Sequence, residues 1–365
     1  MALTTVRPEG MGFNTGRRNL IINGAMQVAQ RGTSATGVGG SPGYFTVDRF
    51  DMYFSGTAGR LTQSQADVTD LAGFQHALKL DCTTADTSIA SDEVAILQYA
   101  IEGQDLQQFK KGYSDAESFT VSFYVKGNAS ATYTIELQDN DNSRQNTQTF
   151  DVTTGWTRVT KTFAADTTGK FDNDNAASLR IQIYLQAGST YTSGTFTSNT
   201  WATLTNANTV KSDQTMFFDS TDRELFITGL QLEVGENASD FEHRSYAEEF
   251  KLCQRYYQII RCTQASQNYL GMLQAYGGVS VFGFVSPYPD HGILRTRPTV
   301  SQSGNFSVGQ SNSASSASGA MQNLGNSDRG WMTGGWTPGS ASFTAGHASV
   351  LYWTTNALLD ADAEL

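Results

Sequence analysis

The chain has 365 residues, including 35 glycines and six prolines, with a formal net charge of −11 and a pI of about 4.8. This length exceeds what one hydrophobic core needs and predicts two domains. The negative charge argues against a surface that follows nucleic-acid phosphates, and the glycine-rich composition favours an all-β globular fold over a disordered chain.

Residues 1–18 lack the apolar core of a secretory signal, and no run of the sequence approaches the roughly 18 apolar residues of a membrane helix. We therefore expect synthesis in a cytoplasm without membrane insertion. We interpret residues 1–18 as a docking arm in which Arg17 and Arg18 meet an acidic partner.

The stretch NLIINGAMQVAQRGTS follows at residues 19–34. Leu20 and Ile22 alternate up to the pair Asn23-Gly24, which is a strong turn signal, and Met26 and Val28 resume the alternation. The pattern predicts either a tight hairpin or a first strand kinked at Gly24.

Several short antiparallel strands are predicted between about residues 50 and 235, because apolar and polar residues alternate there between turn-rich clusters. The alternation is clearest at residues 118–127, 131–139 and 178–186. The predicted inward-facing residues are Phe119, Val121, Phe123, Val125, Tyr133, Ile135, Leu137, Leu179, Ile181, Ile183 and Leu185.

Residues 223–235 are apolar on both faces, and the phase changes near Gly229. This pattern predicts a β-bulge at Gly229 in a strand that lies centrally, because a strand with two apolar faces needs cover on both sides.

A helix is predicted at residues 245–256. Ser245 and Glu248 have the spacing of a capping box, and Lys251 and Arg255 lie where the helix dipole favours cations. We expect this helix to link the two domains.

Strand patterns return after the helix, at residues 256–262 and 279–285. Residues 301–330 are rich in Ser, Gly and Asn, and a loop of that length is unusual in a compact domain. We therefore expect short strands within it, or packing against neighbouring chains.

Three segments together resemble a family of tailed-bacteriophage virion proteins described as tail fibre or minor structural proteins. They are NLIINGAMQVAQRGTS, YFTVDRFDMY at residues 44–53, and GLQLEVGENASDFEHRSYAEEFKLCQRYYQ at residues 229–258. The similarity in order and spacing covers roughly residues 17–258. The closing LDADAEL and the stretch around Arg297 and Pro298 are weaker matches. Where the family often carries larger groups near NLIING, this chain has Ala25 and Ala29, which argues against a glycan contact there.

The resemblance implies a jelly-roll β-sandwich similar to carbohydrate-binding modules at residues 19–244. It also implies a second, smaller β-sandwich at residues 257–365, assembly as a homotrimer, and location in the virion with other virion proteins as partners.

No catalytic motif is present. The histidines His76, His243, His291 and His347 are far apart in sequence, and no nucleophile elbow or phosphate-binding loop occurs. We expect His243 to pack near the start of the helix. Cys82, Cys253 and Cys262 have no metal-ligand spacing and are interpreted as buried thiols. The sequence therefore favours a protein that is not an enzyme.

Two DNDN tetrads place Asp139, Asp141, Asp172 and Asp174 among amide side chains. Such oxygen clusters suit a structural calcium ion, although neither tetrad has EF-hand spacing. The alternative is that both form Asx-type turns between strands.

Large aromatic residues in polar segments are candidate sugar-stacking platforms, because a ring face packs on the apolar face of a pyranose. These candidates are Tyr191, Phe196, Trp201, Trp331 and Trp336. The alternative is packing in small satellite cores or at a subunit interface.

The leading hypothesis is a phage tail appendage that binds a host surface glycan without catalysis. A purely architectural virion protein, such as a capsid decoration or tail adaptor, is the alternative. A polysaccharide depolymerase is a second alternative, since two acids that flank a sugar leave no sequence signature.

Overall fold

The computed structural model describes residues 18–261, 268–274, 294–296, 298–303, 306–310, 321–327, 330–336, 348–353 and 358–365. The fold is all-β, and the chain divides into two compact units, Met1–Ser245 and Tyr246–Leu365. In the part of the chain that the structure describes, no helix is long and apolar enough to cross a membrane.

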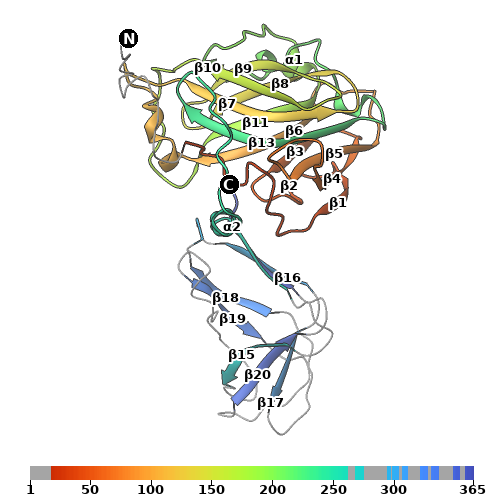
Figure 1. Cartoon of the computed structure of the whole chain (residues 1–365). Coiled ribbons are helices and arrows are strands. Elements are labelled where there is room, and N and C mark those ends of the chain that lie inside the picture. Colours follow the sequence, from red (N-terminus) through yellow and green to blue (C-terminus); the bar gives the residue numbers. More distant parts are fainter. Residues whose placement is uncertain are drawn as a thin grey trace, which may run out of the picture. The chain divides into compact units, whose positions relative to one another are not determined.

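The first unit is a jelly-roll sandwich of two antiparallel sheets (Figure 1). One sheet has six strands, in the order β1 (Ser34–Val38), β4 (Arg60–Asp67), β5 (His76–Thr84), β13 (Glu224–Val234), β7 (Phe119–Gly127) and β10 (Thr157–Phe163). The other has seven, in the order β12 (Ala202–Thr203), β9 (Arg144–Val152), β8 (Ala131–Asp139), β11 (Ala177–Ala187), β6 (Val94–Glu102), β3 (Asp51–Ser55) and β2 (Gly43–Tyr44).

The core lies between these sheets, and the predicted alternation in β7, β8 and β11 is confirmed. All the residues predicted to face inward on these strands belong to one buried cluster, to which β13 adds Leu225, Ile227, Leu230 and Leu232. Burial of one face fixes the register, because a slip of one residue would turn the apolar set to the solvent.

Strand β13 lies between β5 and β7 and carries the predicted bulge. Its register against β7 shifts between Thr228 and Gln231. Gly229 has φ +64°, and a Cβ there would come within 2.8 Å of the Phe74 ring. The central position and the bulge were both predicted from the sequence and are confirmed.

The entry segment differs from both alternatives predicted for it. Residues 22–25 form a turn, the first strand begins only at Ser34, and Ile21 is buried while Leu20 and Ile22 are half-buried. The backbone of this segment bonds to β13, because the N–H of Leu20 donates to the carbonyl of Leu232 (3.1 Å) and the N–H of Leu230 to the carbonyl of Gly24 (3.0 Å). Side-chain bonds supplement this pairing: Asn19 Oδ1 accepts from the N–H groups of Ile21 (2.9 Å) and Leu232 (3.2 Å). Residues 19–25 therefore end in a turn, and hydrogen bonds hold them against Leu230 and Leu232 of β13.

Short helical segments connect the strands of this unit. Two of them are consecutive turns, η2 (Gly103–Asp105) and η3 (Gln107–Phe109), which follow β6. Three more lie between β11 and β13: α1 (Ser189–Thr192), η4 (Asn206–Asn208) and η5 (Phe217–Asp219).

The second unit begins with helix α2 (Tyr246–Cys253), which ends three residues earlier than predicted. One sheet contains β14 (Tyr257–Arg261), β21 (Leu358–Asp362) and β16 (Thr299–Ser303), and another contains β15 (Asn268–Gln274), β20 (Ala348–Trp353) and β17 (Phe306–Gln310). Strands β18 (Met321–Ser327) and β19 (Gly330–Trp336) pair with each other. The short strands expected within residues 301–330 are therefore present, whereas the strand predicted at 279–285 lies outside the described residues.

Candidate functional site

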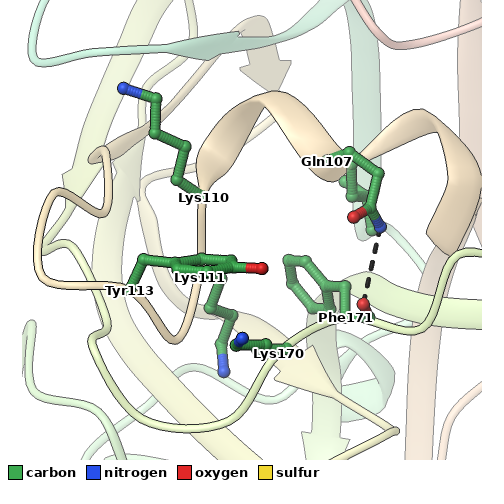
Figure 2. A pocket seen from close by; sticks show the side chains of 7 residues that line it. Gln107, Lys110, Lys111, Tyr113, Lys170 and Phe171 are labelled. Carbon is green, nitrogen blue, oxygen red and sulfur yellow. Dashed lines mark hydrogen bonds between the residues drawn. The ribbon is translucent and has the colours of Figure 1, made fainter.

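A small pocket of about 60 Å³ opens in the first unit beside η3. The loop between η3 and β7 and the loop between β10 and β11 form its walls (Figure 2). The pocket is lined by Leu106, Gln107, Lys110, Lys111, Tyr113, Lys170 and Phe171.

The two loops touch through their backbones at Gly112. Its N–H donates to the carbonyl of Asp166 (2.9 Å). Its φ is +81°, and a Cβ would lie 2.7 Å from the carbonyl oxygen of Gly169. A glycine is required at this position because any side chain would separate the loops and open the pocket wall.

The base of the pocket is a buried ion cluster centred on Lys111. Its side chain is fully buried, and Nζ lies 2.6 Å from Asp139 Oδ2 and 3.0 Å from Asp166 Oδ2. Nζ also donates to the carbonyls of Thr168 (2.8 Å) and Gly169 (3.0 Å). Arg144 binds both oxygens of Asp166, at 2.7 and 3.0 Å. The two cations balance the two carboxylates, as buried charges require.

Aromatic rings surround this ion cluster. Lys111 Nζ lies 5.3 Å from the ring centroid of Phe171 and 5.4 Å from that of Trp201. Phe119 packs 5.8 Å from Trp201 and stacks at 4.0 Å on Phe109. The rings keep water from the ion pairs, which strengthens their mutual attraction.

The rim of the pocket carries one aromatic side chain and two cations. Tyr113 is 51% exposed, and Lys170 Nζ lies 3.9 Å from its ring centroid. Lys110 pairs with Asp115 (3.1 Å) and Glu117 (3.4 Å), and these hydrogen bonds raise the pKa of Lys110. In the described part of the chain, Lys170 has no carboxylate within ion-pair distance.

Gln107 closes the pocket opposite Tyr113. Its Nε2 donates to the carbonyls of Gly103 (2.9 Å), Asp172 (3.3 Å) and Phe171 (3.5 Å), which fixes the amide. In Figure 2 the hydroxyl of Tyr113 points toward the side of the pocket where Phe171 and Gln107 lie.

The four aspartates predicted to bind calcium do not converge on one point. Asp139 is paired with Lys111, while Asp141 Oδ2 accepts the backbone N–H of Asp172 (2.9 Å) and Asp174 Oδ1 that of Ala176 (2.9 Å). The oxygens around Asp139 do not fit a calcium ion, because the Lys111 ammonium already occupies them. Among the described residues, no group of three carboxylate, histidine or cysteine side chains is placed to hold a metal ion.

The tetrads do make the side-chain-to-backbone bonds of turns. Asp139 Oδ1 accepts the N–H of Asn142 (3.1 Å), and Asn142 Nδ2 donates to the carbonyl of Lys170 (2.9 Å). These bonds bring the two tetrads side by side and hold the pocket wall.

Of the aromatic residues predicted to bind glycans, Tyr191, Phe196 and Trp201 belong to the first unit, and none of these three lines the pocket. Trp201 is partly buried, and its Nε1 donates to the carbonyl of Ala164 (2.7 Å). Its ring packs beside Lys111 at the base of the pocket. Tyr191 packs on Tyr184 with a centroid distance of 6.4 Å, and Phe196 is half-buried in the loop after α1. Trp331 and Trp336 belong to β19 in the second unit, and their side chains lie outside the described part.

None of the other candidate residues that the structure describes lines the pocket. The backbone N–H of Arg18 donates to Glu242 Oε2 (2.9 Å), and Arg17 lies outside the described residues. His243 packs between Phe74 and Phe241 as predicted, and His76 lies 3.2 Å from Asp67. Cys82 and Cys253 are buried thiols as predicted, while His291, His347 and Cys262 lie outside the described residues.

Lys111, Tyr113 and Lys170 were not predicted as site residues from the sequence. The adjacent lysines and the Gly-Tyr pair of KKGY are visible in the sequence, but the contacts of Lys111 with Asp139 and Gly169 and of Lys170 with Tyr113 span 28 to 58 positions. Only the fold joins them.

Another buried acid, which does not line the pocket, belongs to the seven-stranded sheet. Glu136 of β8 is fully buried and accepts a hydrogen bond from the hydroxyl of Tyr184 (2.9 Å). Burial raises the pKa of Glu136 to about 7. Burial also raises the pKa of Tyr184, so the pair is held as a neutral acid and a phenol at low pH.

No protein-family model and no curated protein matches this sequence. Similar solved structures include a family 30 carbohydrate-binding module (12% identity, TM-score 0.30, covering 62% of this chain and 92% of that one). A module in complex with β-1,4-galactotriose is 9% identical, with TM-score 0.31 and coverage of 60% and 99%. A family 11 module from a cellulosomal cellulase of Clostridium thermocellum is 10% identical, with TM-score 0.27 and coverage of 56% and 98%. Likeness at this level assigns no ligand to this chain.

Proposed function

We propose that the first unit is a non-catalytic module that binds a surface glycan at the pocket beside η3. The observation that supports this most directly is the half-exposed ring of Tyr113 at the mouth of a pocket lined with hydrogen-bond donors. A sugar ring packs its apolar face on such a ring, while its polar substituents enter the pocket.

The rigidity of the pocket also supports a binding role. Lys111 ties both loops to β8 through buried ion pairs, and Gln107 is fixed by carbonyl acceptors on both sides. A site that is ordered before the ligand arrives loses less conformational entropy on binding.

The experiment is a glycan array probed with the full chain and with two tyrosine variants. Tyr113→Ala removes the ring at the pocket, and Tyr53→Ala removes an exposed ring of β3 that does not line it. We expect Tyr113→Ala to weaken binding about 3- to 10-fold or more, consistent with the roughly 0.5–1.5 kcal/mol of an aromatic contact. Binding that survives Tyr113→Ala unchanged, or no binding by the full chain, would contradict the proposal. Reducing ends released from bound polysaccharide would show a depolymerase instead.

We further propose that the protein is a tail fibre or appendage component of a bacteriophage virion, made in the host cytoplasm and assembled as a homotrimer with other virion proteins. This part rests on the resemblance of residues 17–258. Virions labelled with an antibody against this chain would show its position by electron microscopy. Light scattering of the purified chain would give three times the 39.6 kDa chain mass if it is a trimer.

A further inference from the structure

The cations of the pocket are unequally compensated. Lys111 and Arg144 are neutralised by Asp139 and Asp166, and Lys110 is neutralised by Asp115 and Glu117. Lys170 has no such partner in the part of the chain that the structure describes, and none of the lining residues is acidic. A single uncompensated ammonium therefore faces the pocket of a chain whose net charge is −11.

The position of Lys170 also differs from that of an ordinary surface lysine. Its Nζ is held 3.9 Å above the ring of Tyr113, which fixes a flexible side chain at the pocket. The Tyr113 hydroxyl is a second donor directed into the same space (Figure 2). Two converging donors match the two oxygens of a carboxylate.

The volume of the pocket limits what can enter it. About 60 Å³ corresponds to roughly four to six water-sized groups at ~10–15 Å³ each. This is enough for a carboxylate and its attached carbon with an ordered water, and too little for a whole pyranose ring.

We propose that the pocket selects a sugar that carries a carboxylate, such as a uronic acid residue, with Lys170 as the residue that determines specificity. The carboxylate enters the pocket and accepts from Lys170 Nζ and the Tyr113 hydroxyl, and the sugar ring stays outside against the Tyr113 side chain. This inference rests on the proposed glycan-binding function and narrows its ligand class.

The test uses pairs of oligosaccharides that differ only in charge. Each uronic-acid oligomer is placed beside its methyl ester, in which the same backbone carries no carboxylate charge. The full chain should bind the acid at least tenfold more tightly than the ester. Its affinity for the acid should fall as salt rises, because the contact is ionic and exposed.

Three variants of the full chain complete the test. Lys170→Met should abolish the preference for the acid over the ester, whereas Lys170→Arg should retain most of it because the charge remains. Lys211→Met is the matched control, since Lys211 is an exposed lysine paired with Asp213 and is not part of the pocket. Both positions, Lys170 and Lys211, are exposed, and a thermal melt confirms that each variant is folded.

The outcomes separate the two proposals. If acid and ester bind equally, or if Lys170→Met keeps the preference, the selection of a carboxylate is wrong while glycan binding stands. If no glycan of either kind binds, glycan binding itself is wrong and the inference fails with it.

Discussion

Lys111 holds its ammonium among four oxygen atoms, one from the end of β8 and three from the loop between β10 and β11, and its side chain is fully buried. Taking charges out of water costs several kcal/mol per ion, and only close pairing recovers that cost. The residue is therefore structurally critical although it makes no contact that a sequence pattern would reveal. The DNDN tetrads did indicate an oxygen-rich place, but not that a lysine from a distant loop would supply the cation.

We predict that Lys111→Met destabilises the protein by about 3–5 kcal/mol, because Asp139 and Asp166 are left with Arg144 as their one cation in the cluster. Urea denaturation measures the loss. The control Lys211→Met removes one partner of an exposed pair with Asp213 and should change stability by less than about 0.5 kcal/mol. Equal effects of the two variants would contradict this account of Lys111.

Metal removal gives a related prediction. Melting temperatures in calcium and in a chelator should agree, because Lys111 occupies the oxygens that a calcium ion would need at Asp139. Differential scanning calorimetry makes the comparison. A calcium-dependent rise in melting temperature that Asp141→Asn or Asp172→Asn removes would restore the original calcium hypothesis.

Because burial raises the pKa of Glu136, we predict that the free energy of unfolding depends on pH. Its pKa in the folded protein is about 7, above its ordinary value of 4.5, so the folded state binds the proton more tightly than the unfolded state. The free energy of unfolding should therefore fall as pH rises from about 4.5 through 7, by at most roughly 3 kcal/mol, and level off above that.

Denaturation curves from pH 5 to pH 9 test this directly. Glu136→Gln keeps an acceptor for the Tyr184 hydroxyl and has no charge to bury, so it should lose this fall and be the more stable protein at pH 8. Glu236→Gln, at an exposed glutamate, is the control and should follow the wild type. If the difference in the free energy of unfolding between the wild type and Glu136→Gln stays constant from pH 5 to pH 8, the raised pKa of Glu136 is wrong.

At the scale of elements, strands buried on one face were predictable and the entry segment was not. In β7, β8 and β11 the alternation follows directly from which side faces the core. Residues 19–33 mimic that alternation, yet the side chains of Asn19 and Asn23 satisfy the local backbone: Asn23 Oδ1 accepts from Val28 N–H (2.9 Å). Such side-chain bonds take the place of a regular ladder, and only two backbone bonds join Leu20 and Gly24 to β13 in the part of the chain that the structure describes.

The bulge in β13 gives a prediction for the same strand. Gly229→Ala should cost about 1–3 kcal/mol, because alanine is strained at φ +64° and its Cβ would meet the Phe74 ring. The control is Gly155→Ala in an open turn, where an added Cβ meets nothing within 4 Å. Thermal or urea unfolding of both variants measures the difference. A Gly229→Ala protein as stable as Gly155→Ala would show that the bulge relaxes freely.

At the scale of the whole molecule, β13 is the last strand of the first unit in sequence and an interior strand in space. It joins β5 on one side to β7 on the other, and it adds four residues to the core. No local pattern could show which strands flank it, because the pairing joins segments about 100 to 150 residues apart.

We predict that a chain ending at Ser245 folds, whereas one ending at Arg223 does not. The shorter chain lacks β13, so the two halves of the six-stranded sheet have nothing to join them. Circular dichroism with urea titration should show a cooperative transition for the longer chain and none for the shorter one. A cooperative transition in the shorter chain would mean that β5 and β7 can pair directly.

The late position of β13 also matters at the ribosome. At roughly 5–20 residues per second, the interval between synthesis of Gly127 and of Val234 lasts about 5–20 s. Throughout that time the nascent chain presents two unpaired strand edges and the apolar face of β7. Sister chains on one polysome present the same edges in the same interval, so exchange of β13 between neighbouring chains competes with its insertion into its own sheet. A chaperone that covers β7 would favour insertion of β13 within its own chain.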